Sequence, residues 1–217
     1  MAAIADTRAA RAEDGVTPLR IPMTVEEFKA WYDREAGRRG EWVDGEVIVF
    51  LAPKVIHPRI IVFLTTVLGM YVQERELGEV IPGPEMRLRG DRSYREPDLL
   101  FVAADGADRL DEDGLGGPAD LAVEVVSNDS VRRDRDDKFV EYEVAGVREY
   151  WLIDPRPGRR TFDAYTLSAA GPYEVIGQDD LGRIGSLVIP GLWVDPDWLW
   201  TDPIQSAPAA LRLIAAE

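Results

Sequence analysis

The sequence predicts an α/β or α+β domain, in which a mixed sheet is flanked by helices and preceded by an N-terminal β-hairpin. Three observations lead to this fold class. Short apolar runs of strand length recur along the chain, one long segment carries its apolar residues at the helical spacing, and a second helical segment separates two of the strand-like runs. Strands and helices that alternate in this way usually form a sheet with helices packed on it.

The first elements expected are a short helix and a hairpin. Thr24, followed by Glu26 and Glu27, is typical of a helix start with Thr24 as the N-cap. Asp44 and Gly45 then lie between two apolar-rich runs within residues 41–50. Because glycine tolerates the positive φ of a tight turn, these residues predict a β-hairpin.

The segment from Pro58 to Leu77 is the clearest helix. Its apolar residues recur at the helical spacing from Ile60 to Val72 and form one stripe. Proline suits the first helical position, and Gly78 suits the position just after the end. We therefore expect a helix whose stripe packs on the sheet.

The strands follow this helix. Residues 80–88 could form one strand, although two prolines break it. A helix is expected over residues 134–145, ending at Gly146. The remaining strands are expected at residues 97–102, 121–126, 149–154, 161–167 and 172–176. Their near-continuous apolar runs are typical of a sheet covered on both faces.

Composition narrows the chemistry. The 217 residues include no cysteine and one histidine, His57, which excludes a disulfide scaffold, a thiolate zinc site and a cysteine nucleophile. Any metal site must then consist mostly of carboxylates and water, the ligands of Mg²⁺, Mn²⁺ or Ca²⁺. The net charge of −15 argues against tight, non-specific binding to nucleic acid.

The chain length favours one domain with tails. We expect a disordered N-terminal tail at residues 1–20, a folded domain at 21–200 and a C-terminal tail at 201–217. Residues 1–20 lack the apolar core of a signal peptide, and the most apolar run, from Ile60 to Leu68, is too short to span a membrane. These features predict a cytoplasmic protein.

Glu124 is the most informative single residue. Alternation along its strand places it with Ala122 and Val126, on the face opposite Val123. A buried carboxylate needs a cation, a metal or a proton, so a metal site and a structural ion pair with an arginine are both open.

Asp98 opens another apolar strand. If Asp98 and Glu124 lie side by side, a shared divalent cation could activate water and stabilise charge on a phosphate. Their carboxyl groups would then lie within roughly 6 Å of each other.

The sequence resembles a known family in several of these segments. Four stretches carry the resemblance: EWVDGE at 41–46, PDLLFV at 97–102, DLAVEVVS at 120–127 and GVREYWLIDP at 146–155. Together they resemble the Uma-type family of restriction endonucleases, a branch of the PD-(D/E)XK nuclease superfamily, from about Met23 to Trp200. The resemblance implies a restriction-endonuclease-like αβββαβ core, Mg²⁺ or Mn²⁺ as cofactor, and hydrolysis of nucleic-acid phosphodiesters. Asp98 matches the first acid and Glu124 the second.

The sequence departs from the superfamily pattern in one place. Val126 stands where a lysine is expected, two residues after the second acid. The family has a lysine on the next helix, which Lys138 matches. We expect the Lys138 ammonium within about 4–6 Å of Glu124. The alternative is an exposed pair with Asp134, four residues earlier on the same helix.

Two further residues match positions of the family. Glu41 is either a third acid of the site or the partner of an exposed arginine. His57 is either a catalytic or metal-binding residue or the cap of the helix that starts at Pro58. A basic cluster just before Asp98 is a candidate nucleic-acid contact, although a solvated loop face is the favoured explanation: Arg87, Arg89, Arg92 and Arg95. Tyr142 and Trp151 are expected in the core.

Two functions remain open. The first is a Mg²⁺-dependent endonuclease in which Asp98 and Glu124 hold the metal and Lys138 orients the attacking water or stabilises charge. The second is a non-catalytic module with the same fold that binds DNA or a protein partner, which the acidic charge and Val126 favour. The expected partner is nucleic acid, DNA in the first instance, and the hairpin and the tryptophan-rich C-terminal end could form a homodimer interface.

Overall fold

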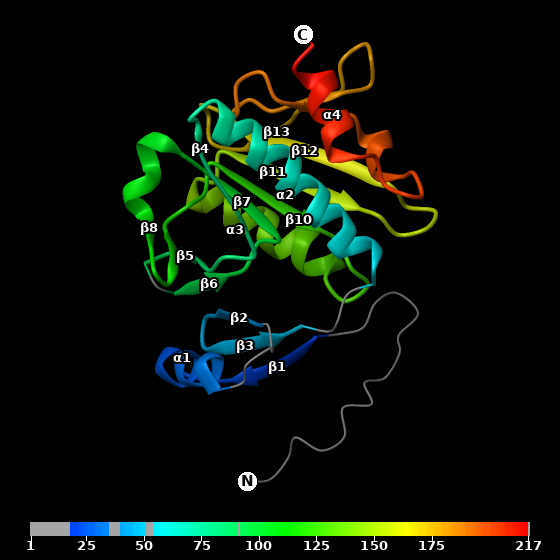
Figure 1. The fold of residues 1–217 in the computed structure, drawn as a ribbon. Coiled ribbons are helices and arrows are strands. Elements are labelled where there is room, and N and C mark those ends of the chain that lie inside the picture. The colour runs from blue at the N-terminus through cyan, green and yellow to red at the C-terminus, as the bar shows by residue number, and fades with distance from the viewer. Residues whose placement is uncertain (1–17, 35–39, 51–53, 91, 217) are drawn as a thin grey trace.

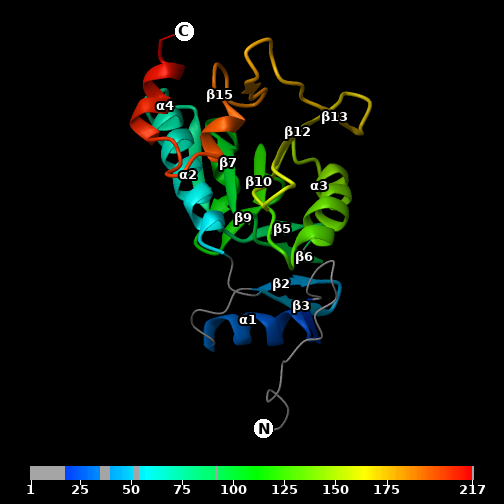
Figure 2. The ribbon, with the colours of Figure 1, turned by 90° about the vertical axis from the view of Figure 1, so that its right-hand side faces the viewer.

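The computed structural model describes residues 18–34, 40–50, 54–90 and 92–216. The chain forms one sheet of six strands, one of seven, and a short ladder of β14 (Ile184–Gly185) and β15 (Trp193–Val194). Helix α2 (Ile56–Glu74) covers one face of the six-stranded sheet, and α3 (Lys138–Ala145) covers the other. Figures 1 and 2 show these three layers, with the N-terminal hairpin below them.

The six-stranded sheet contains the predicted nuclease-like core. Its order is β13 (Tyr173–Val175), β12 (Thr161–Leu167), β11 (Glu149–Asp154), β10 (Leu121–Val125), β7 (Leu99–Ala103) and β4 (Gly78–Pro82). β10 is antiparallel to β7 and parallel to β11, so the sheet is mixed. Leaving aside the short strands of the other sheet, the chain passes through α2, β4, β7, β10, α3 and β11, which is the expected αβββαβ order.

Alternate side chains of β10 point to opposite faces of the sheet, as predicted, and pack into two separate hydrophobic clusters. Val123 belongs to a cluster with the buried stripe of α2, including Leu64, which is 1% exposed. Ala122 and Val126 belong to a second cluster on the α3 face. Glu124 lies on this second face, because successive strand residues point to opposite sides. By length and composition α2 could cross a membrane, but here its stripe packs on the sheet.

The end of α2 differs from the prediction. The helix ends at Glu74 rather than Leu77, and the left-handed residue after its end is Glu76, with a φ of 53°. Gly78 instead opens β4 with a φ of 144°. A Cβ there would lie 2.0 Å from the carbonyl oxygen of Val102, so the close pairing of β4 with β7 requires glycine.

The seven-stranded sheet contains the predicted hairpin. Its order is β1 (Leu19–Pro22), β3 (Glu46–Val49), β2 (Gly40–Val43), β6 (Ser93–Arg95), β5 (Met86–Leu88), β9 (Gly114–Gly116) and β8 (Leu110–Asp111). Asp44 and Gly45 turn the chain between β2 and β3 with φ values of 46° and 92°. The strand predicted over residues 80–88 is two strands, β4 and β5, which belong to different sheets.

Helix α1 (Val25–Arg34) packs on the hairpin through Phe28 and Trp31. Its predicted N-cap is confirmed, because Thr24 and Glu27 exchange hydrogen bonds as a capping box. The other short elements are the 3₁₀ turns η1 (Ala104–Arg109) and η3 (Pro196–Leu199) and the π-helical turn η2 (Arg133–Asp137) before α3.

The predicted domain limits need correction at the C-terminal end. Residues 201–217 were expected to be a tail, but Ala207–Ile214 forms α4, whose Ala210 and Ile214 are buried in the same core as α2. The folded part therefore extends beyond residue 200. At the other end, β1 begins at Leu19, whereas residues 1–17 of the predicted tail lie outside the described residues.

Candidate active site

Asp98 and Glu124 lie next to each other at one end of the six-stranded sheet. Val123 of β10 pairs with Leu99 of β7, so the antiparallel register places Glu124 beside Asp98, the residue just before β7. The backbone N–H of Val125 donates to Asp98 Oδ2 at 2.8 Å. Both acids are buried, at 9% and 3% exposure. The predicted neighbourhood is confirmed, and the separation of roughly 6 Å stays a prediction.

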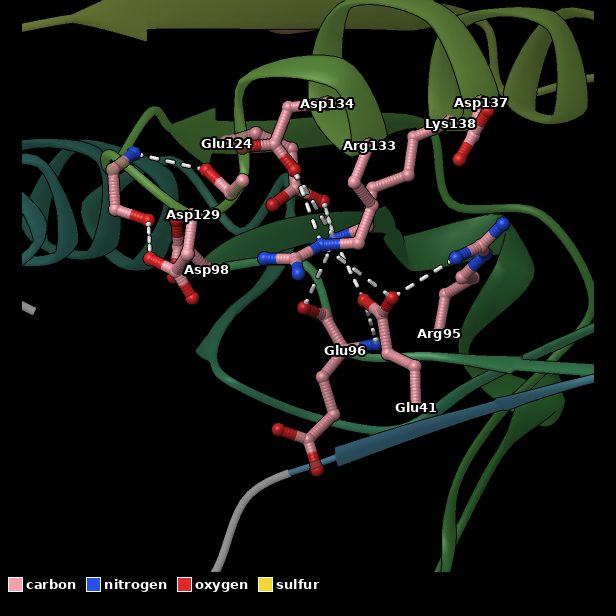
Figure 3. A network of polar contacts seen from close by, with 12 residues as sticks. Glu41, Arg95, Glu96, Asp98, Glu124, Asp129, Arg133, Asp134, Asp137 and Lys138 are labelled. Carbon is pink, nitrogen blue, oxygen red and sulfur yellow. Dashed lines mark hydrogen bonds and ion pairs between the residues drawn. The ribbon is translucent and has the colours of Figure 1, made fainter. Parts of the chain in front are cut away.

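Lys138 points into this pair, as expected. Its Nζ lies 2.7 Å from Glu124 Oε1 and also 2.7 Å from Glu41 Oε1 (Figure 3). The side chain is 1% exposed, which rules out the exposed alternative beside Asp134, although Asp134 Oδ1 lies 3.9 Å from Nζ. One ammonium thus joins an acid of the seven-stranded sheet to an acid of the six-stranded sheet.

The π-helical turn η2 brings further residues to the site. Arg133, Asp134 and Lys138 are all buried, and both Arg133 and Lys138 approach Glu41. In a regular α-helix, residues five apart would point about 140° away from each other. A π turn bonds residues five apart, which reduces this angle, and such turns are frequent at functional sites. The helix predicted over residues 134–145 is otherwise confirmed, including its end at Gly146 with φ 91°.

Glu41 is held by cations on several sides. Arg95 Nη1 donates to Glu41 Oε2 at 3.0 Å, and the N–H of Glu96 donates to Oε1 at 3.2 Å. Burial raises the pKa of this carboxyl, but Lys138, Arg95 and Arg133 outweigh burial and lower the pKa from 4.5 to about 2. Glu41 is therefore ionised. The alternative interpretation of Glu41 expected an exposed arginine as its partner, but Arg95 is only 3% exposed.

Glu124 has the opposite electrostatics. Burial raises its pKa to about 8, and the nearby carboxylates of Asp134, Asp98 and Glu41 act in the same direction, whereas Lys138 opposes them. Tyr142 donates its hydroxyl to the same oxygen, Oε1, at 2.8 Å. Tyr142 was expected only in the core, where it also lies. Its spacing of four residues from Lys138 could have indicated that both face the same acid.

His57 also reaches the site. Its Nε2 lies 3.2 Å from Asp98 Oδ2, and the ring is buried, with no hydrogen-bond partner for Nδ1 among the residues that the structure describes. The capping alternative is wrong, because α2 begins after Val55 and has no side-chain cap. Asp98 Oδ2 is thus held by the backbone of Val125 and approached by His57.

The predicted basic cluster does not form one basic surface. Arg95 is buried, and its guanidinium donates to Glu141 and Glu41, so it cannot contact nucleic acid as folded. Arg87 is paired with Asp111. Arg89 and Arg92 both contact Asp44, and the Arg92 side chain is the most exposed of the four at 70%.

Sequence reasoning missed most of the buried charge around the predicted residues. Arg133, Asp134 and Glu141 are all buried within this network. Burial raises the pKa of Asp134, and Lys138 and Arg133 oppose that rise. Val126, where the superfamily has its lysine, packs in the core beside Ala122. No pattern in the sequence joins residues 41, 95 and 141, because they meet only through the pairing of β2 with β6 and the packing of α3 beside these strands.

The donor set fits a hard divalent cation that keeps part of its water shell. Among the described residues, no hydrogen bond reaches Glu124 Oε2 or Asp98 Oδ1, while the other oxygen of each acid is held by the protein. The same residues hold no group of three or more His, Asp or Glu side chains arranged for a metal. Mg²⁺ is commonly bound through one or two carboxylates together with water and substrate phosphates. Two free carboxylate oxygens meet that requirement.

Comparison with known proteins agrees with this fold. A solved structure described as "a putative nuclease belonging to DUF820 from Anabaena variabilis" matches with a TM-score of 0.64 and 19% identity. The match covers 82% of this chain and 98% of that one, and at this identity it shows the fold alone. No curated protein matches the sequence. The profile of the family described as "Uma2: Putative restriction endonuclease" matches residues 25–199. This chain therefore belongs to the Uma2 family.

Proposed function

We propose that this protein is a Mg²⁺-dependent endonuclease that hydrolyses phosphodiester bonds of nucleic acid, with DNA as the expected substrate. The observation that carries the proposal is the position of Lys138, whose ammonium lies 2.7 Å from Glu124, next to Asp98. Two acids and a lysine beside each other are the minimum that this reaction needs: a metal site and a cation for the developing negative charge.

Asp98 and Glu124 would hold the cation. When bound, Mg²⁺ supplies Lewis-acid polarisation of a phosphate oxygen. The protein fixes both carboxylates in advance. Lys138 and Tyr142 hold Glu124 by Oε1, and the Val125 N–H holds Asp98 by Oδ2. Such preorganisation keeps the free oxygens in place.

Lys138 has the second role. Its ammonium lies between Glu41 and Glu124 and makes a longer contact of 3.5 Å to the carbonyl oxygen of Glu96. An attacking water or a phosphate oxygen could replace this long third contact. Electrostatic stabilisation of developing charge is strongest where bulk water is excluded, and Lys138 is 1% exposed. Glu41 fixes the ammonium from the other side.

Cleavage of labelled DNA duplexes, single-stranded DNA and RNA in Mg²⁺, in Mn²⁺ and in chelator tests the proposal. We expect metal-dependent cleavage that Asp98→Asn and Glu124→Gln abolish. Asp108→Asn and Glu174→Gln are matched controls, because both side chains are exposed. The melting temperature should also rise with Mn²⁺ in the wild type and not in Glu124→Gln, since a cation that binds only the folded state stabilises it.

The alternative is a non-catalytic module that binds DNA or a protein partner, and the net charge of −15 favours it. This charge opposes approach to nucleic acid, so we expect weak binding that needs metal and low salt. Binding without cleavage, unaffected by Asp98→Asn, would establish the alternative. The absence of cysteine fits the cytoplasm, the location we expect.

A further inference from the structure

Arg133, in the π turn η2, carries hydrogen-bond donors that no acceptor among the described residues uses. The residue is 9% exposed, and its Nε and Nη1 are buried without a hydrogen-bond partner in the described part of the chain. Its Nε lies 3.8 Å from Glu41 Oε2 and 3.6 Å from Asp134 Oδ1, which is too long for a hydrogen bond. Folded proteins satisfy nearly all buried donors, so unused ones require an explanation.

Arg95 provides an internal comparison. It is buried beside the same acid, yet its Nε donates to Glu141 at 2.7 Å and its Nη1 to Glu41 at 3.0 Å. Arg95 therefore has the contacts of a structural counterion. Arg133 shares the charge and the burial but not the hydrogen bonds. Neutralising Glu41 does not account for a second guanidinium held in this way.

The Arg133 side chain borders a cleft of about 1180 Å³. Residues of β1, β2 and β3 line one side of this cleft, and residues of η2 and α3 line the other. The Arg133 guanidinium stacks on the ring of Phe50, with Cζ 4.4 Å from the ring centroid, which fixes its plane. Figure 3 shows it among Glu41, Glu124 and Lys138.

The chemistry of this group selects its ligand. Burial opposes the charge of Arg133, but Glu41, Asp134 and Glu124 raise its pKa, so the guanidinium stays ionised. A planar, charged fork with unused N–H groups matches the paired oxygens of a phosphate. The site acids repel an anionic substrate, and the Arg133 cation at the wall of the cleft would offset that repulsion beside the acids.

We propose that Arg133 binds an oxygen of a substrate phosphate from this cleft and so positions the nucleic-acid backbone beside Asp98 and Glu124. This inference rests on the nuclease function proposed above. Because Arg133 contacts the phosphate rather than a base, its contribution is independent of nucleotide sequence.

Anisotropy of a short fluorescein-labelled DNA duplex, titrated with the full chain in Ca²⁺ at low salt, tests the proposal. We expect Arg133→Gln to weaken binding by about tenfold or more and to reduce its salt dependence by about one phosphate contact. Arg133→Lys, which keeps the charge but loses the fork, should lie in between. Arg148→Gln is the matched control, since this arginine is exposed and lies outside the cleft.

Thermal melts of the same variants separate binding from folding. Wild-type affinity in Arg133→Lys, together with loss in Arg133→Gln only in proportion to lost stability, would overturn the proposal and leave Arg133 as a counterion of Glu41. Wild-type protein that binds the duplex without cleaving it would refute the nuclease function, yet the Arg133 comparison would still decide the phosphate contact. If the wild type and all Arg133 variants cleave nucleic acid with equal efficiency, the phosphate contact is refuted and the nuclease function stands.

Discussion

Two buried glutamates share one ammonium and behave in opposite ways. Glu41, on β2 of the seven-stranded sheet, and Glu124, on β10 of the six-stranded sheet, each lie 2.7 Å from Lys138 Nζ. The pKa of Glu41 is lowered to about 2, and that of Glu124 is raised to about 8. Distance to the lysine cannot explain this difference. The remaining neighbours do, because Glu41 also has Arg95 and Arg133, whereas Glu124 has Asp98 and Asp134.

Within this network Glu41 has a structural role and Glu124 a functional one. Glu41 is neutralised by protein cations alone, so it can hold Lys138 in place. Glu124 lacks enough positive charge among its protein neighbours and therefore favours either a proton or an added cation. This imbalance supports the metal site proposed above, because perturbed pKa values of this kind are concentrated at functional sites.

Replacing Lys138 should produce the largest effect, because it removes the partner of both acids. We expect Lys138→Met to abolish cleavage and to lower the free energy of unfolding by about 3–5 kcal/mol, as when one partner of a buried ion pair is removed. The burial of Lys138 makes this large loss the expected result. Urea unfolding at neutral pH measures it, and stability equal to the wild type would contradict the buried network.

The two glutamates should then differ when each becomes glutamine. Glu41→Gln removes a carboxylate that is ionised and paired, so we expect a loss of about 3 kcal/mol at neutral pH. Glu124→Gln keeps an acceptor for Lys138 and Tyr142 and removes a repelled charge, so its stability should change by less than about 1 kcal/mol. Urea unfolding of both variants at one pH decides this, and equal losses would remove the distinction between the two acids.

The pH dependence of stability gives a smaller effect with opposite signs. The lowered pKa of Glu41 contributes stability that is present above pH 4.5 and is lost as the pH falls toward about 2. The raised pKa of Glu124 contributes stability that is present below pH 4.5 and is lost as the pH rises toward about 8. In a plot of the free energy of unfolding against pH, Glu41→Gln should flatten the slope at acidic pH. Glu124→Gln should flatten the slope between about pH 4.5 and 8.

One further carboxyl must be controlled in that experiment. Burial raises the pKa of Glu85 to about 7, so it acts in the same direction as Glu124. The variant Glu85→Gln therefore serves as the control for the slope between about pH 4.5 and 8. If Glu85→Gln alone removes that slope, Glu124 does not titrate in the predicted window.

Tyr142→Phe should have the smallest effect. It removes one hydrogen bond to Glu124 Oε1 and leaves Lys138 in place, at a cost of about 1 kcal/mol in stability. Because Glu124 is then less firmly oriented, the affinity for Mn²⁺ should fall by roughly tenfold. Calorimetric titration with Mn²⁺ measures this, with Tyr165→Phe as a control from the aromatic cluster on the same face. Unchanged affinity would return Tyr142 to a packing role.

Local patterns were sufficient for most of the fold. The hairpin around Gly45, the stripe of α2 and the strands β10 and β11 all follow from periodicity and turn chemistry. The helix α4 was missed because only packing against α2 makes its short apolar face useful. Residues 80–88 were misassigned because two prolines mark a change of sheet rather than a break in one strand.

The site was predictable only in part. Glu124 and Asp98 were identified as acids within apolar strands and Lys138 through the family resemblance, and the structure brings all three together. Tyr142 carried a helical-spacing signal that was not used. Arg133 could not be found in this way, because a regular helix would point it away from Lys138.

The widened turn at residues 133–137 makes the length of this segment, as well as its composition, part of the site. Deleting the exposed Asp136 would remove no side chain of the buried network and would restore a regular helix. Arg133 and Lys138 would then be four residues apart, about 40° from each other around the helix, so both would still face the acids. Inserting one residue would instead place them six apart, about 120° from each other. Removal of one exposed residue from this segment should therefore disturb the site less than insertion of one.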